Sequence, residues 1–157
     1  MGPARAHGSS MLRTCPACGA HNRVPPTKLA TVGKCGKCGT ALPASSAPID
    51  VGDVATFDAI VAGSPVPVVV DFWAPWCGPC RMTAPEVKHA AADLAGLAVV
   101  VKIDTDKVPA LAQRYQVSGI PNFAVFRGGK LAHQQAGALK APQIVSLATM
   151  STPGVSQ

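Results

Sequence analysis

The sequence predicts an α/β domain, in which helices flank a central mixed sheet, preceded by a small cysteine-rich unit. Apolar runs of strand length alternate with helical patterns between residues 49 and 150, and glycine or proline separates them. Two C-x2-C pairs within residues 15–38 predict the small unit. A length of 157 residues allows this combination and excludes a TIM barrel or a kinase.

The elements of the main domain follow from their residues in order. Asp53 can cap a helix that Gly63 ends, and the β-branched run 66–73 is typical of a strand buried on both faces. Glycine and proline interrupt the chain at 77–80, and a helical pattern continues to about residue 95. The remaining elements are expected to be a strand over 97–103, a helix over 108–115, strands over 122–127 and 131–137 joined by a hairpin turn, and a helix over 141–150. This order predicts a mixed sheet with helices on both faces.

Composition excludes several classes of protein. Apolar residues form 48% of the chain, enough for a packed core, and charged residues form only 14%, which excludes a disordered polyelectrolyte. The longest apolar runs, such as residues 97–101, are far shorter than the roughly 18 residues of a membrane-spanning helix. Residues 1–15 contain no apolar segment of the length that an export signal needs. We therefore expect a cytoplasmic protein with no membrane partner.

Positive charge is concentrated at the start of the chain. Residues 1–49 contain six Lys or Arg and no acidic residue, whereas eight basic and eight acidic residues balance within residues 50–157. Four thiolates that bind one dication would lower the charge of the first segment by two. This segment also has no aromatic residue on which bases could stack, so nucleic acid is not the expected partner.

The first four cysteines form a pattern that is typical of a zinc site. Cys15, Cys18, Cys35 and Cys38 have the spacing C-x2-C-x16-C-x2-C, which lies within the range of a tetrathiolate zinc ribbon. Two residues between cysteines make a tight turn that presents both sulfur atoms to one ion, and two such turns complete a tetrahedron. Residues 12–42 show no periodic apolar pattern from which to build a core, so one structural zinc ion is expected. Two structural disulfides are the alternative, which a reducing cytoplasm disfavours.

The last two cysteines lie in the segment W-C-G-P-C. Cys77 and Cys80 fall between a predicted strand and a predicted helix, with Gly78 and Pro79 between them. Unpaired backbone N–H groups and the helix dipole stabilise an anion at a helix N-terminus, so the reactive thiolate form of Cys77 is expected to be favoured. One helical turn brings Cys80 back to the same side, where it can form a disulfide with Cys77. We expect a redox-active pair; a structural disulfide or half of a zinc site are the alternatives.

The segment V-V-D-F-W-A-P-W-C-G-P-C-R, residues 69–81, resembles the active-site segment of thioredoxins. The resemblance covers about residues 49–150 and includes Pro85, K-I-D at 102–104, G-I-P at 119–121, the G-G turn at 128–129 and Gly137. It implies the thioredoxin fold and a cis peptide bond before Pro121, which leaves the backbone of Ile120 free to pair with a bound peptide. We expect the substrate-docking surface to consist of Trp76, Gly78, Pro79, Ile120 and Pro121.

Two charged residues interrupt the apolar strands. Asp71 lies within the run 66–73, where burial should raise the pKa of its carboxyl group and suit it to accept a proton near neutral pH. The thioredoxin resemblance implies that Asp71 helps to deprotonate Cys80; alternatively, it is a strand-end acid that backbone donors satisfy. Lys102 resembles the family lysine that pairs with this aspartate, or it is exposed at a strand edge.

A four-cysteine ribbon ahead of a thioredoxin domain resembles zinc-containing bacterial thioredoxins of the thioredoxin 2 type, and H-N-R-V-P and K-C-G-K-C-G within the ribbon strengthen the match. We expect five segments: a disordered or artificially added stretch 1–11, the zinc ribbon 12–42, a linker 43–48 of sequence P-A-S-S-A-P, the thioredoxin domain 49–150 and a tail 151–157.

The expected activity is reduction of protein disulfides by thiol–disulfide exchange. The Cys77 thiolate attacks a disulfide of a partner protein, and Cys80 then attacks Cys77 and releases the reduced partner. The chain has no G-x-G-x-x-G element, so we expect it to bind no flavin or nicotinamide and to be reduced, as the resemblance implies, by an NADPH-dependent thioredoxin reductase. Two other interpretations of the ribbon remain: a binding module for nucleic acid or protein, and a redox sensor that releases zinc on oxidation.

Overall fold

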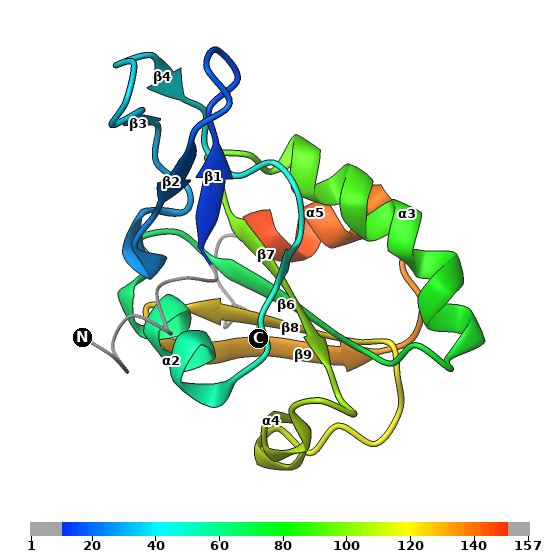
Figure 1. Ribbon diagram of the computed structural model, residues 1–157. Helices are drawn as coiled ribbons and strands as arrows, with labels where there is room; N and C mark the ends of the chain where they lie inside the picture. Colours follow the sequence, from blue (N-terminus) through cyan, green and yellow to red (C-terminus); the bar gives the residue numbers. More distant parts are fainter. Residues whose placement is uncertain (1–10, 151–157) are drawn as a thin grey trace.

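The computed structural model describes residues 11–150 of the chain, and segments 1–10 and 151–157 lie outside the described residues. A five-stranded sheet with the order β5-β7-β6-β8-β9 forms the centre of the main domain (Figure 1). The pairs β5–β7 and β7–β6 are parallel, and the pairs β6–β8 and β8–β9 are antiparallel. The elements are β5 (Ile49–Asp50), α2 (Val54–Gly63), β6 (Val68–Trp73), α3 (Gly78–Asp93), β7 (Val99–Asp104), α4 (Pro109–Arg114), β8 (Asn122–Arg127), β9 (Lys130–Ala136) and α5 (Ala141–Thr149).

The sheet has a helix layer on each face, as the sequence predicts. Alternate residues of β6 serve opposite layers, because successive side chains of a strand point to opposite faces. Val69 packs with α3 and α5, while Val68 and Val70 pack with α2 and α4. Figure 1 shows α3 and α5 together on one side of the sheet and α2 and α4 on the other. In the described part of the chain, no helix is long and apolar enough to cross a membrane.

The predicted elements of the main domain are all present, with ends that differ by no more than about three residues. The turn between β8 and β9 contains Gly128 and Gly129 at φ values of 58° and 83°, a backbone region that glycine enters without steric cost. The sequence analysis missed β5 (Ile49–Asp50), because two residues carry no alternation that marks a strand. This strand forms through parallel pairing with the edge of β7, where Ile49 lies opposite Val101.

The cysteine-rich unit consists of two short antiparallel pairs joined by a turn of 3-10 helix. Its elements are β1 (Leu12–Thr14), β2 (His21–Arg23), η1 (Pro26–Lys28), β3 (Gly33–Lys34) and β4 (Ala41–Leu42), and β1 pairs with β2 as β3 does with β4. We call residues 12–42 the ribbon. Figure 1 shows it at the upper left, at one end of the main sheet, and η1 contacts α2.

The ribbon shares the core of the main domain, which the sequence did not indicate. Val24 and Leu29 are buried in the same apolar cluster as Phe57 and Ile60 of α2. Met11, which the sequence analysis placed in a disordered or added segment, is also buried there with 2% of its surface exposed. Residue 11 is therefore ordered and packs with the fold.

This shared cluster predicts that truncating a ribbon side chain weakens the main domain. Leu29→Ala should lower the free energy of unfolding by about 2 to 4 kcal/mol, because Leu29 is buried, whereas Leu12→Ala should cost less than about 1 kcal/mol, because Leu12 is 56% exposed. Both tryptophans, Trp73 and Trp76, lie in the main domain, so tryptophan fluorescence during urea unfolding reports on that domain. Equal midpoints for the two variants would contradict the shared core.

Candidate functional site

Cys77 and Cys80 lie at the junction between β6 and α3. Cys77 is the N-cap residue of α3, and the two cysteines form a disulfide with Cα atoms 5.2 Å apart. The backbone N–H of Cys80 donates a hydrogen bond to Sγ of Cys77 over 3.1 Å. This donor belongs to the first helical turn, where N–H groups have no intrahelical partner and favour an anion. The junction therefore supports a thiolate at Cys77 once the disulfide is reduced.

A loop from the far side of the domain approaches the pair. The peptide bond between Ile120 and Pro121 is cis, and the carbonyl oxygen of Ile120 lies 3.7 Å from Sγ of Cys77. Ile120 and Trp73 pack against the small buried cluster that contains both cysteines. The structure thus brings two segments that are about 40 residues apart in the sequence to one sulfur atom.

The surface around Cys77 is apolar and open on one side. Trp76 is 67% exposed, and its indole N–H donates a hydrogen bond to a carboxylate oxygen of Asp106 over 3.0 Å. Pro79 is also exposed, while Gly78 is half-buried. Sequence reasoning missed Asp106, because an acid in a turn after β7 carries no motif and only the fold places it beside the indole.

Asp71 is a buried carboxyl group in the middle of the central strand β6. Only 3% of its surface is exposed, and Oδ1 has no hydrogen-bond partner. Burial raises the pKa of Asp71 to about 7; the charge of Lys102 opposes this shift and the charge of Asp50 adds to it. The alternative that backbone donors satisfy both oxygens is not what the structure shows. The carboxyl group can therefore exchange a proton near neutral pH.

Lys102 lies opposite Asp71 in the pairing of β6 with β7. Its Nζ atom lies 4.5 Å from the centre of the Trp73 ring, and within residues 11–150 no ion pair joins it to Asp71. Lys102 therefore lowers the pKa of Asp71 through its charge and not through an ion pair. Asp50 faces Lys102 from β5 on the other side of β7, and sequence reasoning missed it together with that strand.

The four ribbon cysteines converge on one point. Their Sγ atoms all lie within 4.8 Å of one another, and none of them is in a disulfide. Sγ of Cys15 lies 3.6 Å from that of Cys38, and Sγ of Cys18 lies 3.7 Å from that of Cys35. Among the residues that the structure describes, this is the cluster whose geometry suits a metal ion. Four sulfur donors in a closed arrangement match a structural site for a thiophilic dication.

The two cysteine turns have the same backbone design. In each turn the N–H four residues after the first cysteine donates to the carbonyl of that cysteine over 2.9 Å, from Gly19 to Cys15 and from Gly39 to Cys35. Gly19 and Gly39 have φ values of 76° and 80°, which explains why glycine follows each C-x2-C pair. The equivalent turns orient two sulfur atoms each toward the centre of the cluster.

Backbone and side-chain donors surround the buried sulfur atoms. The N–H groups of Ala17 and Lys37 donate to Sγ of Cys15 and Cys35 over 3.4 and 3.3 Å. The side chain of Asn22 links the two turns: it donates to Sγ of Cys35 over 3.5 Å and accepts from the N–H of Gly36 over 2.9 Å. Such donors stabilise thiolates, the form in which cysteine binds a metal. The residues present therefore fit a bound metal ion.

A cysteine pair at the start of a helix, beside a cis-proline loop on a mixed sheet, defines a thiol–disulfide oxidoreductase. The family model described as Thioredoxin matches residues 49–150, and the chain belongs to the thioredoxin family. A second family model, described as Thioredoxin 2, N-terminal, matches residues 14–40 and so covers the four-cysteine ribbon. The two models together span most of the described chain.

Curated relatives align with the main domain. Thioredoxin 1 of Chlorobaculum tepidum is 46% identical over 89 residues, which are 57% of this chain and 88% of that protein. The chloroplastic thioredoxin Y2 of Arabidopsis thaliana is 44% identical over 90 residues, 57% of this chain and 54% of that protein. A mutant thioredoxin from Halobacterium salinarum is similar in structure, with a TM-score of 0.61 and 32% identity over 73% of this chain and all of its own. Plasmodium falciparum thioredoxin gives a TM-score of 0.58 and 29% identity over 63% of this chain and 94% of its own.

The buried carboxyl group predicts a stability that falls as the pH rises. The pKa of Asp71 is about 7 in the folded chain and about 3.8 when unfolded, so the folded state holds the proton more tightly between these values. Well below pH 4 the carboxyl is protonated in both states, so its ionisation does not affect stability; above pH 7 the folded state carries a buried charge. Asp71→Asn should therefore stabilise the oxidised protein by roughly 2 to 4 kcal/mol at pH 8 and by almost nothing at pH 4.

Urea unfolding of the oxidised protein at a series of pH values measures this difference. The matched control is Asp93→Asn, whose carboxylate is 54% exposed and lies beside His89 on the surface of α3. It should change the free energy of unfolding by less than about 0.5 kcal/mol at either pH. A pH-independent effect of Asp71→Asn would show that the carboxyl group is not held protonated by burial.

Proposed function

We propose that the chain reduces disulfides of other proteins, with Cys77 as the nucleophile and Cys80 as the resolving thiol. The observation that carries this proposal is the hydrogen bond from the N–H of Cys80 to Sγ of Cys77 at the start of α3. The Cys77 thiolate attacks one sulfur of the partner's disulfide, that bond breaks, and a mixed disulfide and a partner thiolate form. The Cys80 thiolate then attacks Sγ of Cys77, and the second partner thiolate leaves. Two electrons pass to the partner, and the chain is left with the Cys77–Cys80 disulfide.

Asp71 is proposed as the group that draws the proton from Cys80. A carboxyl group whose pKa is about 7 is partly ionised at neutral pH. Its protonated and ionised forms then have similar free energies, so it can accept a proton or release one at little cost. Lys102 has a positioning role in this proposal, because its charge lowers the pKa of Asp71 without forming an ion pair with it. Burial of Asp71 and its placement on the strand that leads into the cysteine loop support both roles.

The proposed docking surface consists of the exposed ring of Trp76, the loop residues Gly78 and Pro79, and the backbone at Ile120 and Pro121. An extended peptide beside Cys77 would meet the carbonyl of Ile120, which already lies 3.7 Å from the sulfur. The exposure of Trp76 and Pro79 supports this role, since apolar groups at the rim favour contact with a partner.

Turnover requires a donor that returns two electrons to the disulfide. We propose an NADPH-dependent thioredoxin reductase in a cytoplasmic setting, on the strength of family membership and of relatives that are named thioredoxins. The metal of the ribbon is proposed to be one structural zinc ion, which Cys15, Cys18, Cys35 and Cys38 would hold; when bound it would cross-link the two cysteine turns and supply no redox chemistry. We also propose a ribbon that ends near residue 42 and a linker over 43–48.

Substitution of the proposed nucleophile tests the mechanism directly. Cys77→Ser should abolish reduction of insulin, because no thiolate remains to attack, while Cys80→Ser should attack once and then accumulate as a mixed disulfide, because the resolving thiol is gone. Insulin turbidity measures the first result, and mass spectrometry of the trapped adduct measures the second. Retained turnover by Cys77→Ser would refute the assignment.

Metal and thiol analysis tests the zinc site. The reduced protein should contain one zinc ion per chain, and oxidation should remove only the two thiols of Cys77 and Cys80 while the zinc stays bound. Cys35→Ser should lose the metal and also lower the stability of the main domain, because the ribbon shares its core. Loss of all thiols on mild oxidation of a metal-free chain would indicate structural disulfides instead.

A further inference from the structure

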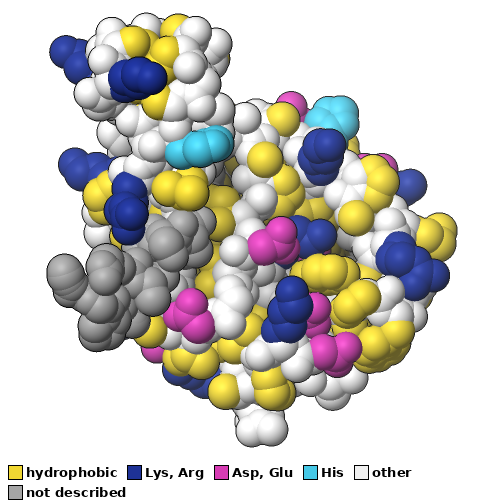
Figure 2. Space-filling view, in the orientation of Figure 1, with side chains coloured by type: hydrophobic (Ala, Val, Ile, Leu, Met, Phe, Trp, Pro, Cys, Tyr) yellow, Lys and Arg dark blue, Asp and Glu magenta, His cyan; other side chains and the backbone are white. Residues whose placement is uncertain are grey.

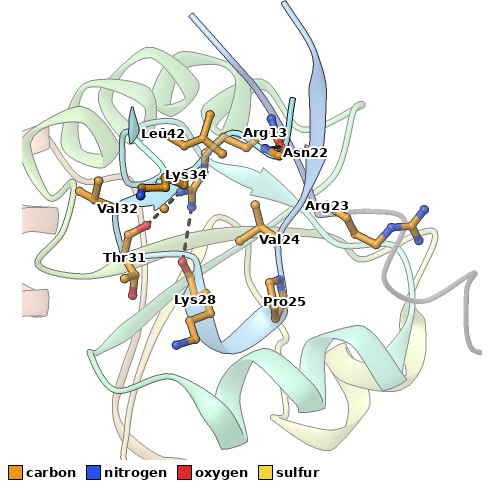
Figure 3. A pocket seen from close by; sticks show the side chains of 12 residues that line it. Arg13, Asn22, Arg23, Val24, Pro25, Lys28, Thr31, Val32, Lys34 and Leu42 are labelled. Carbon is orange, nitrogen blue, oxygen red and sulfur yellow. Dashed lines mark hydrogen bonds between the residues drawn. The ribbon is translucent and has the colours of Figure 1, made fainter. Parts of the chain in front are cut away.

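We propose that a hollow in the ribbon docks an extended acidic segment of a partner protein, at a site separate from Cys77. The redox mechanism does not use this surface. The hollow lies between the two strand pairs and η1, and its volume is about 500 Å³, a size that suits a few peptide side chains. Figure 3 shows the side chains that line it.

Aliphatic side chains form the apolar part of the hollow. Val24, Val32 and Leu42 line it together with Pro25, and Val32 is 62% exposed although it is a large apolar residue. Figure 3 shows these residues around one opening. An aliphatic side chain of a bound segment would cover Val32 and remove apolar surface from water.

The residues that line the hollow include four cationic side chains and no carboxylate. The Arg13 guanidinium donates hydrogen bonds to the carbonyl oxygens of Thr31 and Leu29 over 2.9 and 3.0 Å. Figure 3 shows the bond to Thr31 and a longer one, 3.5 Å, to the carbonyl oxygen of Lys28. Across residues 11–150, no carboxylate lies within ion-pair distance of Arg13. Lys28 and Lys34 are exposed at the same hollow, and the first acidic residue of the sequence is Asp50. A carboxylate from outside the chain would supply the missing negative charge.

The surface of the ribbon that Figure 2 shows is also basic. In Figure 2 the lobe that the ribbon forms at the upper left carries Lys, Arg and apolar side chains but no Asp or Glu on the face shown. Nucleic acid would also meet positive charge here, but residues 1–49 contain no aromatic side chain on which a base could stack. Valine and leucine side chains beside cations fit a peptide that contains both carboxylates and aliphatic groups.

The position of the ribbon leaves the redox site free. Thr27 of η1 lies against Gly63, the last residue of α2, shortly before β6 begins at Val68, whereas Cys77 follows the other end of β6. Six residues of strand at about 3.3 Å each separate the two ends by roughly 20 Å. A partner held at the ribbon could therefore present its disulfide to Cys77, and its effective concentration there would rise. This consequence rests on the proposed function, whereas binding at the hollow does not.

Binding to a defined peptide tests the proposal without any redox step. The probe is a fluorescein-labelled peptide of alternating Glu and Leu residues, titrated with the full-length, metal-bound, oxidised chain while fluorescence anisotropy is recorded. We expect saturable binding that weakens as the salt concentration rises from about 50 to about 300 mM. The double variant Lys28→Glu, Lys34→Glu should lose at least about tenfold in affinity. The control Lys88→Glu, Lys107→Glu makes the same change in charge outside the hollow and should lose less than about twofold.

Two further measurements test the contribution of the peptide's charge and that of the apolar residue Val32. The peptide with Gln in place of Glu should bind at least about tenfold more weakly, and Val32→Asp, which changes the exposed apolar residue, should weaken the Glu–Leu peptide by a similar factor. Equal loss in the two double variants, equal binding of the Gln peptide, or tighter binding of a single-stranded oligonucleotide at the same hollow would each overturn the proposal. Zinc content and circular dichroism confirm that the variants are folded. Loss of insulin reduction by Cys77→Ser with unchanged peptide binding would keep this result separate from the redox assignment.

Discussion

The junction between β6 and α3 is the constraint on which the rest of the structure depends. The strand must end and the helix must begin within a few residues, so that Sγ of Cys77 meets an N–H group of the first helical turn. Pro79 is compatible with this start because a residue in the first turn needs no N–H donor. Burial of β6 between two helix layers holds the junction in place, and the cis-proline loop reaches the same sulfur from another part of the sheet.

The same strand holds a buried carboxyl group, Asp71, which destabilises the fold when it is charged and which the proposed mechanism uses. A buried aspartate on a central strand is unfavourable in its charged form, and Oδ1 of Asp71 has no compensating donor. Apolar neighbours on both faces of the sheet supply the stability that tolerates this carboxyl group. Lys102 on the neighbouring strand β7 and Asp50 on β5, one strand further, act on its pKa in opposite directions. Its proton affinity is thus set by burial first and by two opposed charges second.

The ribbon combines two kinds of stabilisation. Four sulfur atoms converge within the ribbon, and the apolar side chains of Val24, Leu29 and the preceding residue Met11 tie it to the main domain. A unit with so few apolar residues cannot fold on burial alone, so the cysteine cluster and the shared core complement one another. This arrangement holds the basic hollow at a defined place at the end of the sheet opposite the redox junction.

By itself, the sequence determined the α/β class, the order of the main elements, the two cysteine sites and the burial of Asp71. These features follow from local patterns: apolar runs, capping residues and fixed cysteine spacings act within a few neighbouring residues. The tertiary structure decided the features that depend on pairing between distant segments. The strand β5 exists because β7 offers an edge, Lys102 lies over Trp73 rather than on Asp71, and Met11 is buried because the ribbon packs on α2. None of these has a local signal, since each arises only when surfaces far apart in the chain meet.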